Sequence, residues 1–61
     1  MYIYKFIITY NSGRQLTEWI GSEGDESLTS LKDRADIFLD ELEADQNVSS
    51  VRMTRQTVPG I

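Results

Sequence analysis

Cysteine and histidine are both absent from the chain. Without cysteine, no disulfide or thiolate metal site forms, and without histidine the commonest zinc ligand and the commonest general base are missing. Catalysis would have to use paired carboxylates, a buried lysine or a tyrosine in a cleft. The sequence indicates no such arrangement, and its glycines match neither a phosphate-binding loop nor a calcium loop. We expect a protein that is not an enzyme and that holds no cofactor or metal.

Long apolar runs are absent as well. No stretch of 18 apolar residues occurs, and the first residues lack the basic and apolar regions of a signal peptide. We therefore expect a cytoplasmic protein that does not enter membranes. Positive charge is scarce, since six Lys and Arg face ten Asp and Glu, for a net charge of -4. Nucleic acids and anionic membranes attract clustered Lys and Arg, so we expect a protein partner, and a basic one.

The composition that remains is that of a folded domain. The 61 residues are 39% hydrophobic and 26% charged, which is ordinary for a soluble globular chain. This length allows one domain, residues 1–61, with a small core whose burial barely offsets the chain entropy. We expect self-association or a partner to supply further stabilisation.

The first third of the chain predicts a β-hairpin. Residues 2–10 are rich in Tyr, Ile and Phe, and residues 14–20 form the returning strand. Between them, Asn11-Ser12-Gly13 suits a three-residue turn with Gly13 in the left-handed position. The cross-strand pairs are then Ile8 with Leu16, Phe6 with Glu18, and Tyr4 with Ile20.

A shorter turn is the alternative. With a two-residue turn at Ser12-Gly13, Phe6 would pair with Trp19, and the change of one residue in register would turn every side chain to the other face. We favour the longer turn because serine is poorly suited to the positive φ that the shorter one demands.

Residues 28–45 change from a period of two to one of 3.6, which indicates an amphipathic helix. Its apolar arc comprises Leu28, Leu31, Ala35, Phe38, Leu39 and Leu42. Ser27 is the expected N-cap, with Thr29 as the alternative, and Asn47 is expected to stop the helix in a left-handed conformation. Residues 48–58 predict a third strand with Val51 and Met53 facing inward.

This order predicts an α+β fold, ββαβ: a three-stranded antiparallel sheet of order 2-1-3 with one amphipathic helix packed on one face. One helix covers one face only. The other face would expose Ile3, Ile7 and Trp19 around Lys5, which at ~25 cal/mol per Å² forgoes several kcal/mol. We expect this face to bind a partner or a second copy, giving a homodimer. In the shifted register, Trp19 would instead lie beneath the helix.

Two sets of charged residues are further candidate binding surfaces. The acidic residues Asp33, Asp36, Asp40 and Glu43 recur along one side of the helix and extend the acidic loop that contains Glu23, Asp25 and Glu26. They form either a docking face for a basic partner or a solvated surface that maintains solubility. Arg52 and Arg55 on the last strand suggest a nucleic-acid contact, or edge charges that prevent aggregation.

The predicted function is that of a small non-catalytic protein-binding module. A hairpin, a helix and a strand in this order recur in small accessory proteins of phages and mobile elements, so we expect an inhibitor or modulator that occludes a site on a larger partner, in the cytoplasm of a host cell. The alternatives are a small nucleic-acid-binding protein and a structural subunit that assembles through its edges.

Overall fold

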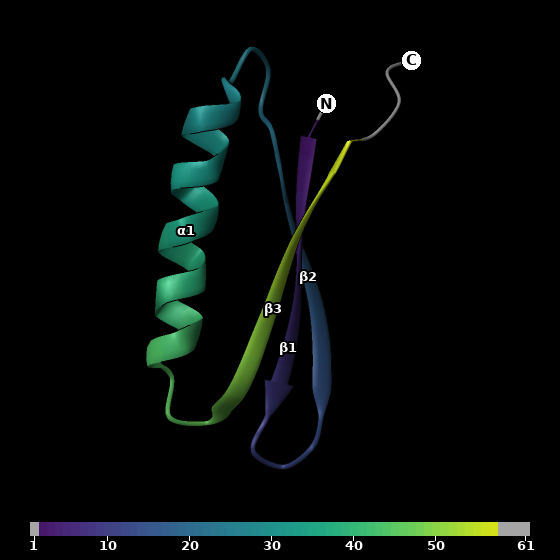
Figure 1. Cartoon of the computed structure of the whole chain (residues 1–61), viewed down its shortest axis with the longest axis vertical. Helices are drawn as coiled ribbons and strands as arrows, with labels where there is room; N and C mark the ends of the chain where they lie inside the picture. Colours follow the sequence, from purple (N-terminus) through teal and green to yellow (C-terminus); the bar gives the residue numbers. More distant parts are fainter. Residues whose placement is uncertain (1, 58–61) are drawn as a thin grey trace.

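Strand β1 (Tyr2–Tyr10) lies in the middle of the sheet, with β2 (Gln15–Gly21) on one edge and β3 (Val48–Thr57) on the other. Both neighbours run antiparallel to it, and helix α1 (Leu28–Ala44) connects β2 to β3 (Figure 1). The computed structural model describes residues 2–57, so residues 58–61 with the expected end of the last strand lie outside it. The predicted ββαβ fold with strand order 2-1-3 is confirmed.

The hairpin has the predicted three-residue turn. Gly13 has a φ of 87°, its N–H donates to the carbonyl of Tyr10 at 2.8 Å, and the Tyr10 N–H donates to the carbonyl of Arg14 at 2.8 Å. No residue other than glycine has a positive φ within residues 2–57, which excludes the shorter turn. The expected pairs are confirmed: Ile8 with Leu16, Phe6 with Glu18, and Tyr4 with Ile20.

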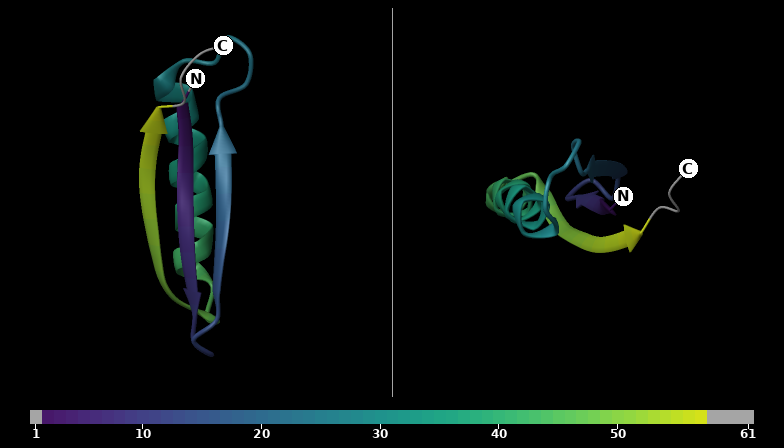
Figure 2. Two further views of the ribbon diagram at one scale, coloured as in Figure 1. Left: turned by 90° about the vertical axis from the view of Figure 1, so that its right-hand side faces the viewer. Right: turned by 90° about the horizontal axis from the view of Figure 1, so that it is seen from above.

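The core lies between the sheet and α1. Alternate residues of β1 point toward the helix, so Tyr4, Phe6 and Ile8 are buried against Leu31 and Ala35. Partly buried side chains complete this layer: Tyr10, Ile20, Phe38, Leu39, Leu42, Val48, Val51 and Met53. Seen from the opposite side of the sheet, α1 runs behind the central strand (Figure 2). All five buried side chains, three from β1 and two from α1, therefore lie on the same side of the sheet.

The structure agrees with the prediction at the start of α1 but not at its end. Ser27 is the N-cap as predicted, because its hydroxyl accepts from the N–H of Ser30 at 3.1 Å. The prediction for Asn47 is wrong: the helix ends at Ala44, and Asp45 caps it in an extended conformation, with its N–H donating to Leu42 at 3.1 Å. The carboxylate of Asp45 then accepts from the Asn47 N–H at 2.8 Å. This short turn replaces the left-handed stop because an aspartate side chain offers the backbone a local acceptor.

We expect Gly13→Ala to lower the free energy of unfolding by about 1–2 kcal/mol, since an L side chain is strained at that positive φ. The Cβ itself would meet nothing within 4 Å, so the cost comes from the backbone alone. Gly21→Ala is the matched control, because its Cβ would only touch Ile3 at 3.8 Å without a positive φ. Urea unfolding measures both variants, and equal midpoints would contradict the assigned turn.

Candidate protein-binding face

The sheet face turned away from α1 is built by every second residue of the three strands. We call it the open sheet face, and its central residues are Ile3, Lys5 and Ile7 of β1, Thr17 and Trp19 of β2, and Arg52, Thr54 and Gln56 of β3. Lys5 lies at its middle, between Trp19 and Thr54. Within residues 2–57, no helix covers this face.

Trp19 is the most prominent apolar group of the open sheet face, with 58% of the residue exposed. The central strand places Ile3 and Ile7 beside it, and both are half-buried. Because the hairpin register is the predicted one, Trp19 does not lie beneath the helix. An exposed indole flanked by two isoleucines is typical of an interface anchor, since Trp is enriched among residues that dominate binding energy.

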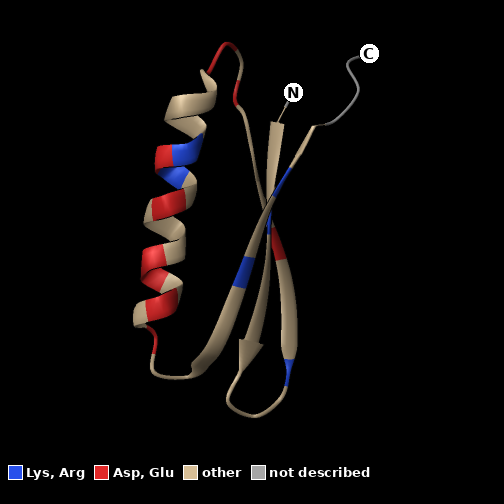
Figure 3. Ribbon diagram, viewed as in Figure 1, with Lys and Arg blue, Asp and Glu red and all other residues tan. Residues whose placement is uncertain are grey.

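The charge of the open sheet face differs from that of the whole chain. Its charged residues, Lys5 and Arg52, are both positive, and no acidic residue of the chain lies among its members. Nine of the ten acids lie between Glu23 and Asp45, and the tenth, Glu18, pairs with Phe6 on the helix side of the sheet. Figure 3 shows this separation, with most of the red on α1 and its preceding loop. The open sheet face is therefore positive although the net charge of the chain is negative.

A shallow hollow borders this face at its hairpin end. It has a volume of about 510 Å³ and is lined by Ile7, Thr9, Gln15, Ser50, Val51 and Arg52. Beside the hollow, the side-chain amide of Gln15 on β2 donates to the hydroxyl of Thr9 on β1 at 3.2 Å. The hollow thus combines one cation with several neutral groups that form hydrogen bonds.

The predicted acidic docking face lies on α1. Asp33, Asp40 and Glu43 are exposed and Asp36 is half-buried. The Lys32 ammonium lies 3.1 Å from the Asp36 carboxylate, and this hydrogen bond raises the pKa of Lys32. Within residues 2–57, the other three acids have no cation within ion-pair distance. Their role as a docking face stays a prediction, and a solvated surface explains them equally well.

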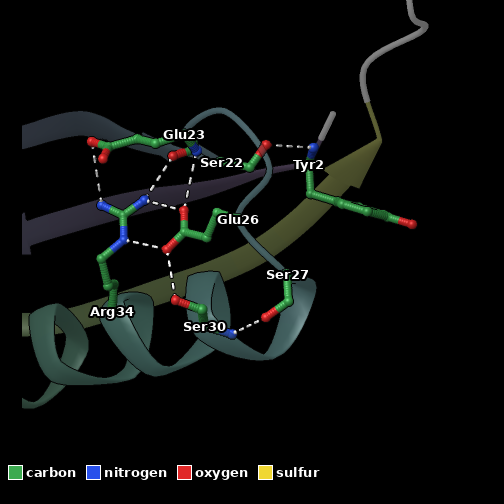
Figure 4. Close-up of polar contacts among 8 residues, drawn as sticks. Tyr2, Ser22, Glu23, Glu26, Ser27, Ser30 and Arg34 are labelled. Carbon is green, nitrogen blue, oxygen red and sulfur yellow. Dashed lines mark hydrogen bonds and ion pairs between the residues drawn. The ribbon is translucent and has the colours of Figure 1, made fainter.

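Arg34 forms a polar cluster that no local sequence pattern predicts (Figure 4). Its guanidinium donates to both carboxylate oxygens of Glu26, at 2.6 and 2.8 Å, and to the carbonyl of Gly21 at 2.9 Å. Glu23 lies further away, at 3.9 Å. The cluster fastens the loop between β2 and α1 to the second turn of the helix. The only sequence signal is the unpaired arginine on the helix, because a contact over eight residues follows no helical spacing.

This cluster corrects the continuous acidic surface expected from the sequence. The Glu26 side chain is only 11% exposed and its charge is balanced by Arg34, so it does not extend the acidic face. Hydrogen bonds from Arg34, and further ones from the Glu23 backbone and the Ser30 hydroxyl, lower the pKa of Glu26 to about 2. Partial burial acts in the opposite direction.

The two arginines proposed as a nucleic-acid contact do not lie together. Arg52 pairs with Ile7 and belongs to the open sheet face, whereas Arg55 pairs with Tyr4 on the helix side. The Arg55 guanidinium lies 5.9 Å from the centroid of the Tyr2 ring, a cation–π distance. The odd spacing of three residues along a strand puts them on opposite faces.

Searches of family models, curated proteins and solved structures give no significant match to this chain. Across residues 2–57, no three His, Cys, Asp or Glu residues gather where they would hold a metal ion. Over the same residues, α1 falls short of the length and apolarity needed to cross a membrane.

We expect the Arg34–Glu26 pair to make the free energy of unfolding depend on pH in the acid range. Because the folded-state pKa of Glu26, about 2, lies below its ordinary 4.5, the pair stabilises the fold fully above about pH 4.5. That stabilisation is lost as the pH falls from about 4.5 toward 2. The difference in unfolding free energy between the wild type and Glu26→Gln should therefore shrink over this window, as followed by urea unfolding at each pH.

Glu43→Gln is the matched control, since it removes the same charge from an exposed position of α1. It corrects for the change in net charge alone. A wild-type advantage over Glu26→Gln that stays constant down to pH 2 would contradict the pairing.

Proposed function

We propose that this chain is a non-catalytic protein-binding module that covers a site on a larger protein with its open sheet face. The observation that carries the proposal is Trp19, 58% exposed on a strand whose register is fixed by the hairpin and flanked by Ile3 and Ile7. Exposed apolar side chains that adjoin one another in a small domain are typical of binding surfaces.

The rigidity of the site supports this role. The open sheet face is carried by paired strands, and Lys5 and Ile7 lie on the central one, where hydrogen bonds run to both neighbours. A surface held in place before binding loses little conformational entropy when it meets its partner. Tryptophan adds a large contact area with only two side-chain torsions. The face is thus suited to occlusion, which needs a fixed surface and no chemistry.

The biological setting that we propose is an inhibitor or modulator carried by a phage or another mobile element and acting in the cytoplasm of a host cell. A small preformed surface is sufficient for such a role. Nucleic-acid binding through Arg52 and Arg55 has less support, because these residues lie on opposite faces of β3. Assembly through the edge strands β2 and β3 has no further observation in its favour.

Trp19→Ala tests the proposal. We expect it to weaken partner binding by about 30-fold or more, as for an interface anchor, while the unfolding free energy changes by less than about 1 kcal/mol. Tagged wild type and variant are used to capture proteins from the cells that produce this chain. Captured proteins are identified by mass spectrometry, and their affinities are then measured with purified components.

Leu16→Ala is the matched control, because Leu16 is 46% exposed on the same strand but faces the helix side. It should capture the same protein as the wild type. If Trp19→Ala also retains full affinity for that protein, the open sheet face is not the binding site.

A further inference from the structure

We propose that the open sheet face binds an acidic segment of its partner, one in which carboxylates alternate with apolar side chains. This inference rests on the proposed function and adds the chemistry of the partner. It differs from the basic partner that the net charge suggests, because it follows from the charges of one face rather than of the whole chain.

The first support is that neither cation of this face has an acidic partner in the part of the chain that the structure describes. Of the six basic residues, Lys32 and Arg34 have acidic partners on this chain, and Arg55 lies over Tyr2. Among residues 2–57, no carboxylate lies within 4 Å of Lys5 or Arg52. A carboxylate of a partner can therefore pair with either one without displacing an internal contact.

The second support is the setting of Lys5. It is half-buried, with Ile3 and Ile7 two residues away on its own strand and Trp19 as its cross-strand neighbour. A partner packed on these apolar groups would exclude water from the lysine ammonium. An ion pair that loses water becomes stronger when its geometry is complementary, and it penalises a partner with the wrong charge.

The third support is the spacing of the two cations. Lys5 pairs with Thr54, so Arg52 is its diagonal neighbour on β3, at a typical separation of about 7–8 Å. Alternate residues of an extended segment repeat at about 6.6–6.8 Å. Two acids separated by one residue therefore match Lys5 and Arg52. The hollow of about 510 Å³ beside Arg52 leaves room for the second acidic side chain.

A second copy of the chain fits this face less well. In a symmetric dimer the same patch meets itself, so the charges of the open sheet face would have to complement one another. Lys5 and Arg52 are both positive, and the face contributes no acid from the described residues. Stacking two such faces would bring like charges together and leave them unpaired.

A nucleic acid is also disfavoured. Proteins that bind single strands on a surface stack successive bases on several aromatic side chains and follow the backbone with many cations. On the part of the open sheet face that the structure describes, Trp19 is the sole aromatic residue, and two cations accompany it.

The test selects random short peptides on the immobilised, folded protein and then measures their affinities in solution. We expect the selected peptides to be rich in Asp or Glu and apolar residues and to require Trp19. Lys5→Glu and Arg52→Glu should each lower the affinity of these peptides by about tenfold, because attraction becomes repulsion. Arg14→Glu and Arg55→Glu are the controls, because they change the net charge equally. Arg55 pairs with Tyr4 on the helix side, and Arg14 precedes β2 at the hairpin end, where its carbonyl accepts from Tyr10, so both should leave the affinities unchanged.

Each contrary result has its own meaning. Peptides that require Trp19 but carry Lys, Arg or no charge would overturn the acidic partner and leave the proposed function standing. If no selected peptide requires Trp19, both fail. A wild-type dimer in sedimentation that Trp19→Ala converts to a monomer would identify a second copy as the occupant. Displacement of the peptides by a single-stranded DNA oligonucleotide would identify a nucleic acid as the occupant.

Discussion

One helix is all that covers the three-stranded sheet in residues 2–57, and this limit shapes the rest of the molecule. Tyr4, Phe6 and Ile8 of β1 are buried on the helix side, so the core is a single layer around Phe6 and Leu31. Phe38 completes it by meeting the Phe6 ring edge to face, with centroids 4.9 Å apart. No other helix or strand of the described residues covers the other side, where β1 has Ile3 and Ile7. The apolarity of the first strand on both sides thus serves folding on one face and leaves a surface for contact on the other.

The same geometry separates the charges. The loop before α1, α1 itself and its C-cap Asp45 carry nine of the ten acids, while the open sheet face carries Lys5 and Arg52. Arg34 lies on the acidic side, where it holds Glu26 and the loop against the helix. The sheet and the helix form only two layers, but exposed charges are screened over about 8 Å at physiological ionic strength. A partner at the open sheet face, as proposed, would therefore respond mainly to the cations beside it. Net charge describes such a molecule poorly.

The sequence predicted the fold because local signals agreed with each other. Gly13 set the register of the hairpin, that register put Trp19 on the open face, and Ser27 marked the start of α1. Two features were missed for different reasons. Arg34 reaches back over the loop to Glu26, a contact that no local pattern encodes. The Asp45 carboxylate accepts from the Asn47 N–H in a local turn, which competes with the left-handed stop expected at Asn47. The grouping of Arg52 with Arg55 neglected the alternation of a strand. Once the register is known, the sequence is sufficient to predict that the open sheet face is positive.

Fluorescence quenching of Trp19, the single tryptophan, measures whether this sheet leaves one positively charged face uncovered. In dilute protein, we expect iodide to quench Trp19 efficiently and caesium much less, because Lys5 and Arg52 attract the anion and repel the cation. The difference should shrink when neutral salt screens these charges. A tryptophan shielded from both ions at every dilution, or one that caesium quenches better than iodide, would contradict the account.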